Sequence, residues 1–240
     1  MQPVSGTLAE PQVRDMFDRI AGVYDRMNGV MTAGLDDHWR RRAADLAQVE
    51  PGDRVLDVAT GTGDLALELA QRVAPGGTVV GADFSERMLE LARDKSVGVA
   101  PREVELRFEQ ANALSLPYRD DEFDAATVGF GARNFSDLRR GLSEMGRVVR
   151  PGGLVVVLEI TTPTRPPLST FLELWFDRIV PSLGRLAGDR EAYSYLPSSV
   201  RRFPAPRELA AVMWECGLRS IRYVLTAGGI IALHVGEVAG

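Results

Sequence analysis

Short apolar runs alternate with amphipathic segments through the middle of the chain. The runs that predict buried strands span 54–58, 78–83, 104–108, 123–128 and 154–160. Segments with apolar residues at helical spacing lie between them, at 64–74, 85–95 and 137–149. Strands that alternate with helices form parallel sheets with helices on both faces. The pattern therefore predicts an α/β protein with a Rossmann-like, doubly wound sheet.

Helical patterns flank this core, and a hairpin closes the chain. Residues 1–50 contain about three helical pieces, including 13–21 and 37–49, and residues 163–206 are mostly helical and punctuated by proline. A helix near 207–215 precedes two apolar strands that Ala-Gly-Gly separates, which indicates an antiparallel hairpin. We therefore expect one domain with a seven-stranded sheet. Its parts are a helical cap (1–50), a ligand-binding core (51–162), a helical insertion (163–206) and a C-terminal helix and hairpin (207–240).

Composition narrows the function classes. The chain has 240 residues, 25% of them charged, and its net charge of -5 disfavours a nucleic-acid partner. Cys216 is the only cysteine, so neither a disulfide framework nor a thiolate metal cluster is expected. We expect no metal at His38 either, because the successive acids Asp36 and Asp37 do not face one site on a helix. The N-terminus lacks the apolar region of a signal peptide, and no apolar run approaches the roughly 20 residues that span a bilayer. We expect a cytoplasmic protein and leave peripheral contact with the inner face of the membrane open.

A glycine-rich stretch, VLDVATGTGD at 55–64, follows the first predicted strand. Gly61, Gly63 and Ala66 fit the G-x-G-x-x-G/A pattern, and Asp83 lies 20 residues beyond Gly63. By itself this is the dinucleotide fingerprint. An NAD-dependent reductase is therefore one interpretation of the stretch.

The acids around the glycines favour a cationic ligand instead. Asp57 precedes the loop, and Asp64 opens the following helix, where a pyrophosphate would rest. Two carboxylates would repel that group by several kcal/mol at an effective dielectric of about 20. S-adenosylmethionine carries an ammonium and a sulfonium but no phosphate, so we expect it here, with Asp83 accepting hydrogen bonds from its ribose. The alternative for Asp64 is an ordinary first-turn acid favoured by the helix dipole.

Five ordered stretches resemble the UbiE/MenG family of quinone-biosynthesis C-methyltransferases, which are class I S-adenosylmethionine-dependent methyltransferases. They are YDRMNGVMTAGLDDHW (24–39), GFGARN (129–134), RVVRPGGLVVVLEIT (147–161), EAYSYLPSSVRRFP (191–204) and TAGGIIALHVG (226–236). The resemblance runs from about residue 13 to residue 236. It implies methylation of a ring carbon of a polyprenyl hydroquinone, with demethylmenaquinol placed ahead of the benzoquinol of ubiquinone biosynthesis.

The resemblance also implies donor contacts at Thr62, Asp83, Asn112 and Ala113. The remaining residues that we predict at the donor site are Asp57, Gly61, Gly63, Asp64, Phe84 and Gly129.

Four positions depart from the family pattern. Gly129 stands where many members have serine, Asp36 where histidine is usual, Thr32 where serine is usual, and Thr60 where the family's Gly-Gly-Thr-Gly loop begins with glycine. Gly129 removes a hydroxyl contact, and the departures together bear on substrate recognition more than on the donor site. They keep open a methyltransferase for another phenolic small molecule and a protein that binds S-adenosylmethionine without catalysis.

Carbon methylation of a hydroquinone requires a phenolate, because deprotonation pushes electron density onto the ortho carbon. Arg133 and Asn134 follow the fourth predicted strand, at the mouth of the expected donor site. We expect Arg133 to stabilise the phenolate or to position a water that takes its proton. Asn134 is expected to orient the phenol oxygen, and Tyr24 to close over the ring or hydrogen-bond to it. The alternatives are a surface arginine and a packing tyrosine.

An apolar stripe at helical spacing lies in the predicted insertion. Its members are Leu168, Phe171, Leu172, Trp175, Phe176 and Ile179. Core packing is the usual meaning of such a stripe. A second interpretation is that part of it forms a channel for the polyprenyl tail or enters the membrane interface. The length of the tail and the oligomeric state, including a homodimer, stay open.

Overall fold

The computed structural model describes residues 10–32, 34–163, 166–179 and 190–240. Within these ranges some side chains are not described. Tyr24 and Ile179, which the sequence singles out, are among them, so their predicted contacts lie outside the described residues.

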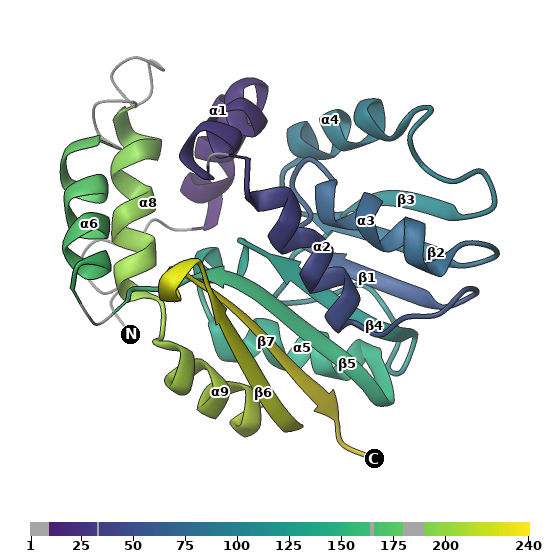
Figure 1. Ribbon diagram of the computed structural model, residues 1–240. Helices are drawn as coiled ribbons and strands as arrows, with labels where there is room; N and C mark the ends of the chain where they lie inside the picture. The colour runs from purple at the N-terminus through teal and green to yellow at the C-terminus, as the bar shows by residue number, and fades with distance from the viewer. Residues whose placement is uncertain (1–9, 33, 164–165, 180–189) are drawn as a thin grey trace.

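A seven-stranded sheet forms the centre of the protein, in the order β3-β2-β1-β4-β5-β7-β6 (Figure 1). Its strands are β1 (Arg54–Val58), β2 (Thr78–Asp83), β3 (Glu105–Gln110), β4 (Phe123–Gly129), β5 (Val149–Ile160), β6 (Leu218–Thr226) and β7 (Ile231–Val238). The first five strands pair in parallel, and β7 is antiparallel to both β5 and β6. The chain reverses its direction of winding between β1 and β4. In such sheets ligands bind at that point, outside the carboxyl ends of the strands.

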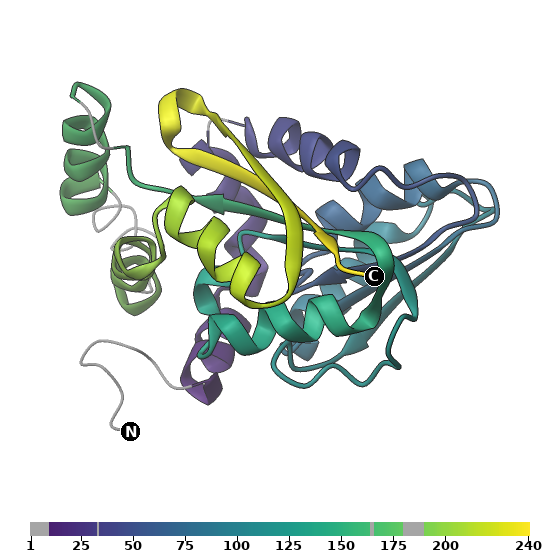
Figure 2. The ribbon, with the colours of Figure 1, turned by 90° about the horizontal axis from the view of Figure 1, so that it is seen from below.

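Helices cover both faces of the sheet (Figures 1 and 2). On one face, α2 (Asp36–Leu46), α3 (Asp64–Val73) and α4 (Glu86–Ser96) contribute buried apolar side chains to one core cluster. On the other face, α5 (Leu138–Val148) and α9 (Pro206–Glu215) build a second cluster. The β1 side chains alternate between the two clusters, as the period of a strand requires.

A third, smaller core lies beyond the carboxyl ends of the strands. It joins α1 (Glu10–Thr32), α6 (Leu168–Leu174), the π-helical turn η2 (Trp175–Ile179) and α8 (Arg190–Arg202) (Figure 1). Its buried members include Met16 from α1, Phe176 from η2 and Val200 from α8. The N-terminal helix and the helical insertion therefore pack together above the edge where a ligand would bind.

The predicted fold class is confirmed, and the core elements lie within a few residues of their predicted bounds. The expectation of about three helical pieces before residue 51 is wrong for the described residues, which form two helices there, α1 and α2. The pattern at 13–21 is part of a helix that continues through Gly22 to Thr32. A glycine costs about 1 kcal/mol in a helix, and the packing of α1 against α4 and α8 offsets that cost.

Candidate active site

The glycine loop turns the chain sharply from β1 into α3. Gly61 and Gly63 both have positive φ, at 57° and 83°, and Gly63 is the N-cap of α3. The amide of Thr60 donates to the carbonyl of Ala82 on β2, which fastens the loop to the neighbouring strand. The loop therefore lies at the carboxyl edge of the sheet, at the predicted position.

A first cavity, called here the donor cavity, opens beside this loop. Seven of the predicted donor or catalytic residues line it: Gly61, Asp83, Phe84, Asn112, Ala113, Gly129 and Asn134. Residues 10 and 17 of α1 line it from the other side. The donor cavity thus brings together the ends of β1, β2, β3 and β4 under the N-terminal helix.

Asp83 is the carboxylate that lines the donor cavity at the end of β2. Its Oδ2 accepts the Gly61 N–H at 2.8 Å, and its Oδ1 accepts the Ser85 N–H at 2.9 Å. Burial raises its pKa to about 6, and these backbone hydrogen bonds act in the opposite direction. An ionised carboxylate has about four lone-pair sites, so Asp83 keeps the capacity to accept hydrogen bonds from a diol.

Asp57 lies behind the loop and does not line the donor cavity. Its oxygens accept hydrogen bonds from the hydroxyls of Thr60 and Thr127, both at 2.6 Å. Burial raises its pKa to about 6 as well. Asp57 therefore holds β1, β4 and the loop together.

Asp64 does not line the donor cavity. This corrects the prediction that its carboxylate favours a cationic ligand there. The Asp64 carboxylate pairs with the Lys95 ammonium of α4 at 2.7 Å and with the Arg40 guanidinium of α2 at 3.5 Å. Lys95 also donates to the Thr62 hydroxyl at 3.0 Å. The two cations compensate the charge of Asp64. The side chains of Thr62 and Asp64, which we predict at the donor site, both contact Lys95.

Glu10 and Phe17 of α1 are donor-cavity residues that the sequence does not reveal. Glu10 accepts hydrogen bonds from the Asn112 side-chain amide, at 3.1 Å, and from the Ser136 hydroxyl. The ring of Phe17 meets that of Phe84 edge to face at 6.4 Å. Because 102 residues separate Glu10 from Asn112, no local pattern could have found this contact.

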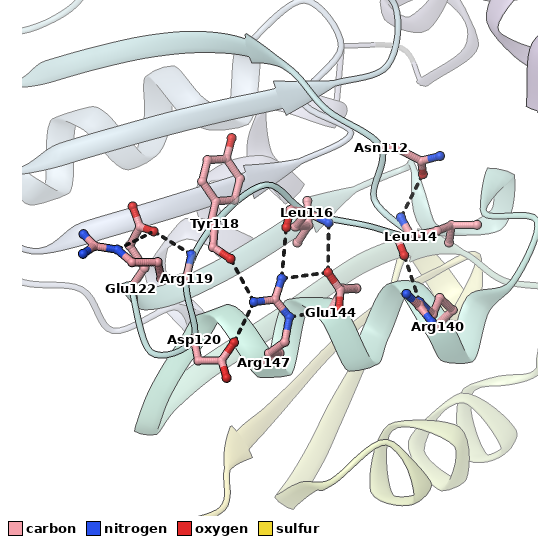
Figure 3. A network of polar contacts seen from close by, with 10 residues as sticks. All are labelled: Asn112, Leu114, Leu116, Tyr118, Arg119, Asp120, Glu122, Arg140, Glu144 and Arg147. Carbon is pink, nitrogen blue, oxygen red and sulfur yellow. Dashed lines mark hydrogen bonds and ion pairs between the residues drawn. The ribbon is translucent and has the colours of Figure 1, made fainter.

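The loop after β3 is fixed by a network of polar contacts (Figure 3). The Arg147 guanidinium donates to the carbonyls of Leu116 and Tyr118 and pairs with Glu144 and Asp120. The hydrogen bond from Arg147 holds the pKa of Glu144 below its usual value. The network ties the loop that follows Asn112 to α5, and it positions one wall of the donor cavity.

A second cavity of about 360 Å³, called here the acceptor cavity, lies between α2, η1 (Ala132–Asn134) and the helical insertion. Its walls are mostly apolar, and they include four members of the predicted stripe: Phe171, Leu172, Trp175 and Phe176. Its polar wall residues, within the described ranges, are Thr32, Asp36, Arg40 and Arg133. Phe130 lines both cavities, so this residue lies between them.

Arg133 and Asn134 lie side by side on the turn η1, at the boundary between the cavities. Arg133 lines the acceptor cavity and Asn134 the donor cavity. The Arg133 guanidinium pairs with Glu159 at 2.7 Å, with the two side chains only 7% and 1% exposed. The alternative of a surface arginine is therefore wrong. The Asn134 Oδ1 is buried and has no hydrogen-bond partner among the described residues, so it can accept a hydrogen bond from a ligand.

The remaining histidine at the sheet and the possible metal ligands can be judged from their surroundings. His234 is fully buried, and its Nε2 lies 2.8 Å from the Pro206 carbonyl. Within the described part of the chain, no three His, Cys, Asp or Glu residues form a group that could hold a metal ion. Over the same ranges, no helix has both the length and the apolar character to cross a bilayer.

Comparisons with known proteins agree with this geometry. The model of the ubiE/COQ5 methyltransferase family matches residues 6–238. A Thermus thermophilus protein named "Demethylmenaquinone methyltransferase" is 48% identical, over 92% of this chain and 99% of its own. A Desulfitobacterium hafniense protein of the same name is 42% identical, over 97% and 92%. A Geobacter sulfurreducens protein, "Ubiquinone/menaquinone biosynthesis C-methyltransferase UbiE", is 42% identical, over 94% and 88%.

Solved structures show the same fold at low sequence identity. An Aquifex aeolicus "SAM dependent methyltransferase" superposes with a TM-score of 0.56 at 19% identity, over 79% of this chain and 84% of that one. The "[4+2]-Cyclase SpnF" superposes with a TM-score of 0.69 at 18% identity, over the whole of both chains. Because these folds carry different activities, the function has to be argued from the site.

Proposed function

Because this chain belongs to the ubiE/COQ5 methyltransferase family, we propose that it methylates a ring carbon of demethylmenaquinol, using S-adenosylmethionine. The family assignment removes the NAD-dependent interpretation of the glycine loop. The observation that carries the proposal is that two cavities lie on either side of Phe130, one lined by Asp83 and amide side chains and the other mostly apolar. The names of the relatives at 42–48% identity support a quinol as the substrate.

The donor cavity fits S-adenosylmethionine. A Cβ added at Gly61 would meet no protein atom within 4 Å, and Gly61 lines the donor cavity, so a ligand can approach the backbone there. Asp83 would accept hydrogen bonds from the ribose hydroxyls, and the adenine would lie between Phe84 and the Asn112–Ala113 segment. Asp57, Thr62 and Asp64 act indirectly, by fixing the loop.

Bound S-adenosylmethionine would supply a methyl group on a sulfonium. The ring carbon would form a bond to that methyl carbon as the carbon–sulfur bond breaks and S-adenosylhomocysteine leaves, and the ring carbon would then lose its own proton to solvent. Arg133 stabilises the phenolate, because its buried guanidinium is held in place by Glu159 at 2.7 Å. Asn134 accepts a hydrogen bond at the boundary and sets the orientation of the acceptor ring. The apolar walls of the acceptor cavity take up the naphthalene ring and the start of the polyprenyl tail.

The test is turnover with short-tailed quinols. Purified protein is incubated with S-adenosylmethionine and either demethylmenaquinol or the benzoquinol precursor of ubiquinone, under reducing conditions, and products are identified by mass spectrometry. We expect a product one methyl group heavier from the naphthoquinol. Methylation of another phenol alone would favour the alternative substrate class. Tight S-adenosylmethionine binding without any product would indicate a binding module.

Lowering the pH from 7 to 5 is expected to weaken S-adenosylmethionine binding about tenfold. The raised pKa of Asp83, about 6, means that its ionised fraction falls from about nine-tenths to about one-tenth over this range. The ionised form accepts the ribose hydrogen bonds, so affinity is present above this pKa and is lost as the pH falls through it. Titration calorimetry at each pH measures the effect.

Two variants show whether the pH dependence comes from Asp83 or from Asp57. Asp83→Asn should bind more weakly at pH 7 and lose the pH dependence. Asp57→Asn should keep it, because Asp57 has a similarly raised pKa but does not line the donor cavity. A pH dependence that persists in Asp83→Asn would contradict the assignment.

We further propose that the mouth of the acceptor cavity touches the membrane that holds the substrate. Leu35 and Phe171, which line this cavity, are about half exposed, and so is Leu174 on the same helix as Phe171. Full burial of such a side chain is worth about 1.5–3 kcal/mol, so transfer of the exposed half of Phe171 into lipid is worth about 0.8–1.5 kcal/mol. Phe171→Ala should therefore weaken binding in liposome flotation by about 4–10-fold. Trp214→Ala is the matched control, since Trp214 is equally exposed on α9 but lines neither cavity. Equal losses in both variants, or no flotation of the wild type, would refute this contact.

A further inference from the structure

A second buried ion pair lines the acceptor cavity, in addition to Arg133, the partner of Glu159. It joins the Asp36 Oδ2 to the Arg40 Nη1 at 2.6 Å, and both side chains are about nine-tenths buried. The Thr32 hydroxyl donates to the other oxygen of Asp36 at 2.8 Å. All three residues line the cavity, whose remaining walls are mostly apolar.

Both ion pairs contact Phe130, the residue that separates the two cavities. The Arg40 guanidinium lies over the Phe130 ring, 5.9 Å from its centre. Arg133 donates a hydrogen bond to the Phe130 carbonyl. The two pairs therefore both lie near the boundary where methyl donor and acceptor would meet.

The packing of the fold does not account for Asp36. A buried ion pair seldom stabilises a protein more than apolar side chains of the same volume would. Arg40 has a structural partner, since it reaches Asp64 at the start of α3. The hydrogen-bond donors to Asp36 are its own near neighbours, four residues away on either side. Asp36 thus connects only the adjoining ends of α1 and α2, yet it places a charge at the wall of an apolar cavity.

Asp36 has the chemistry of a hydroxyl acceptor. Burial raises its pKa, but the hydrogen bond from Thr32 and the charge of Arg40 outweigh burial, so that its pKa lies below the usual value and the carboxylate is ionised. An ionised carboxylate accepts about four hydrogen bonds, and Thr32, Arg40 and the backbone amide of Asp36 itself provide three. It can therefore accept another from an O–H group in the cavity.

Resting on the function proposed above, we propose that Asp36 accepts a hydrogen bond from the hydroquinone hydroxyl beside the tail-bearing carbon. Arg133 then faces the opposite hydroxyl, which lies beside the carbon that is methylated. Asp36 is a positioning and specificity residue: a ring without the second hydroxyl leaves the remaining acceptor site of this buried carboxylate without a donor. Sites built to bond a hydroxyl discriminate strongly against analogues that lack it. The enzyme would thereby select the reduced ring, with both oxygens protonated.

The experiment compares two substrates that react at the same carbon. One is 2-geranyl-1,4-dihydroxynaphthalene, and the other is its 1-methyl ether, which keeps the free hydroxyl beside the reacting carbon. Wild-type protein should prefer the diol in kcat/KM by about 10–100-fold, the range expected for one hydrogen bond to a charged group. Asp36→Asn should reduce this preference about tenfold or more, by lowering kcat/KM for the diol while leaving that for the ether nearly unchanged.

Two further variants make the result specific. Asp37→Asn is the matched control, because Asp37 also contacts Arg40 but is exposed and does not line the cavity. It should retain the wild-type preference. Thr32→Val removes the hydroxyl that orients Asp36 and should reduce the preference in the same direction, by less. It also provides the test if Asp36→Asn does not fold.

The outcomes separate this inference from the function on which it rests. If wild-type protein methylates neither compound, the proposed function fails. If it methylates the diol but Asp36→Asn lowers both activities equally, or leaves the preference unchanged, then Asp36 has only a structural role and the inference is overturned.

Discussion

Replacement of Arg133 by methionine is expected to lower kcat/KM for the hydroquinone by about 100–1,000-fold, the usual loss when one charge-stabilising donor is removed. The same change should lower the free energy of unfolding by about 3–5 kcal/mol, because it leaves a buried charge without its partner. That charge is on Glu159, which is 1% exposed and pairs with Arg133 at 2.7 Å. Steady-state kinetics and chemical denaturation measure the two effects.

A second substitution separates catalysis from stability in this pair. In Arg133→Met/Glu159→Gln no buried charge remains, and the glutamine can still accept a hydrogen bond from the backbone amide of residue 133 or Ile160. The double variant should therefore regain most of the lost stability while its activity stays low. If activity returned together with stability, Arg133 would act on the fold alone, and its proposed role at the phenolate would be wrong.

The parts of the site that the sequence predicts are those set by local pattern. Asp83 ends a buried strand, and Asn112 follows the next one, so the rule that ligands bind at the carboxyl ends of parallel strands places both together. The glycine loop follows from a strand, two glycines and a helix start in direct succession. The same rule predicts Arg133 and Asn134 at the site, because they follow the end of the fourth strand.

The parts that the sequence does not predict depend on contacts between distant segments. Lys95 reaches Asp64 across 31 residues and changes the electrostatics of the loop. The acceptor cavity combines Thr32 and Arg40 with Phe130, Trp175 and Ile230, which come from widely separated segments. The helical stripe in the insertion is typical of core packing and also allows a channel. The structure combines the two, since Leu172 and Phe176 are buried members of the third core and also line the acceptor cavity.

Alanine substitutions at the two loop glycines are expected to have different effects, although both glycines have positive φ. An added Cβ at Gly63 would lie 2.9 Å from the Phe108 ring and 3.0 Å from the Ala92 Cβ. Left-handed backbone costs a non-glycine residue about 1–2 kcal/mol, and overpacking costs about 1–3 kcal/mol more. Gly63→Ala should therefore lower the free energy of unfolding by about 2–5 kcal/mol.

Gly61→Ala should affect folding less than Gly63→Ala does, and it should mainly lower the affinity for S-adenosylmethionine. Its Cβ would meet no protein atom within 4 Å, so only the backbone cost of about 1–2 kcal/mol applies to folding. Because Gly61 lines the donor cavity, that Cβ would occupy space taken by S-adenosylmethionine, and a clash of about 1–3 kcal/mol lowers affinity by about 5–100-fold. Denaturation and calorimetry on the two variants test this division. If Gly61→Ala bound the donor with wild-type affinity, the ligand would not approach the loop at Gly61, and the placement of the donor beside Asp83 would have to be abandoned.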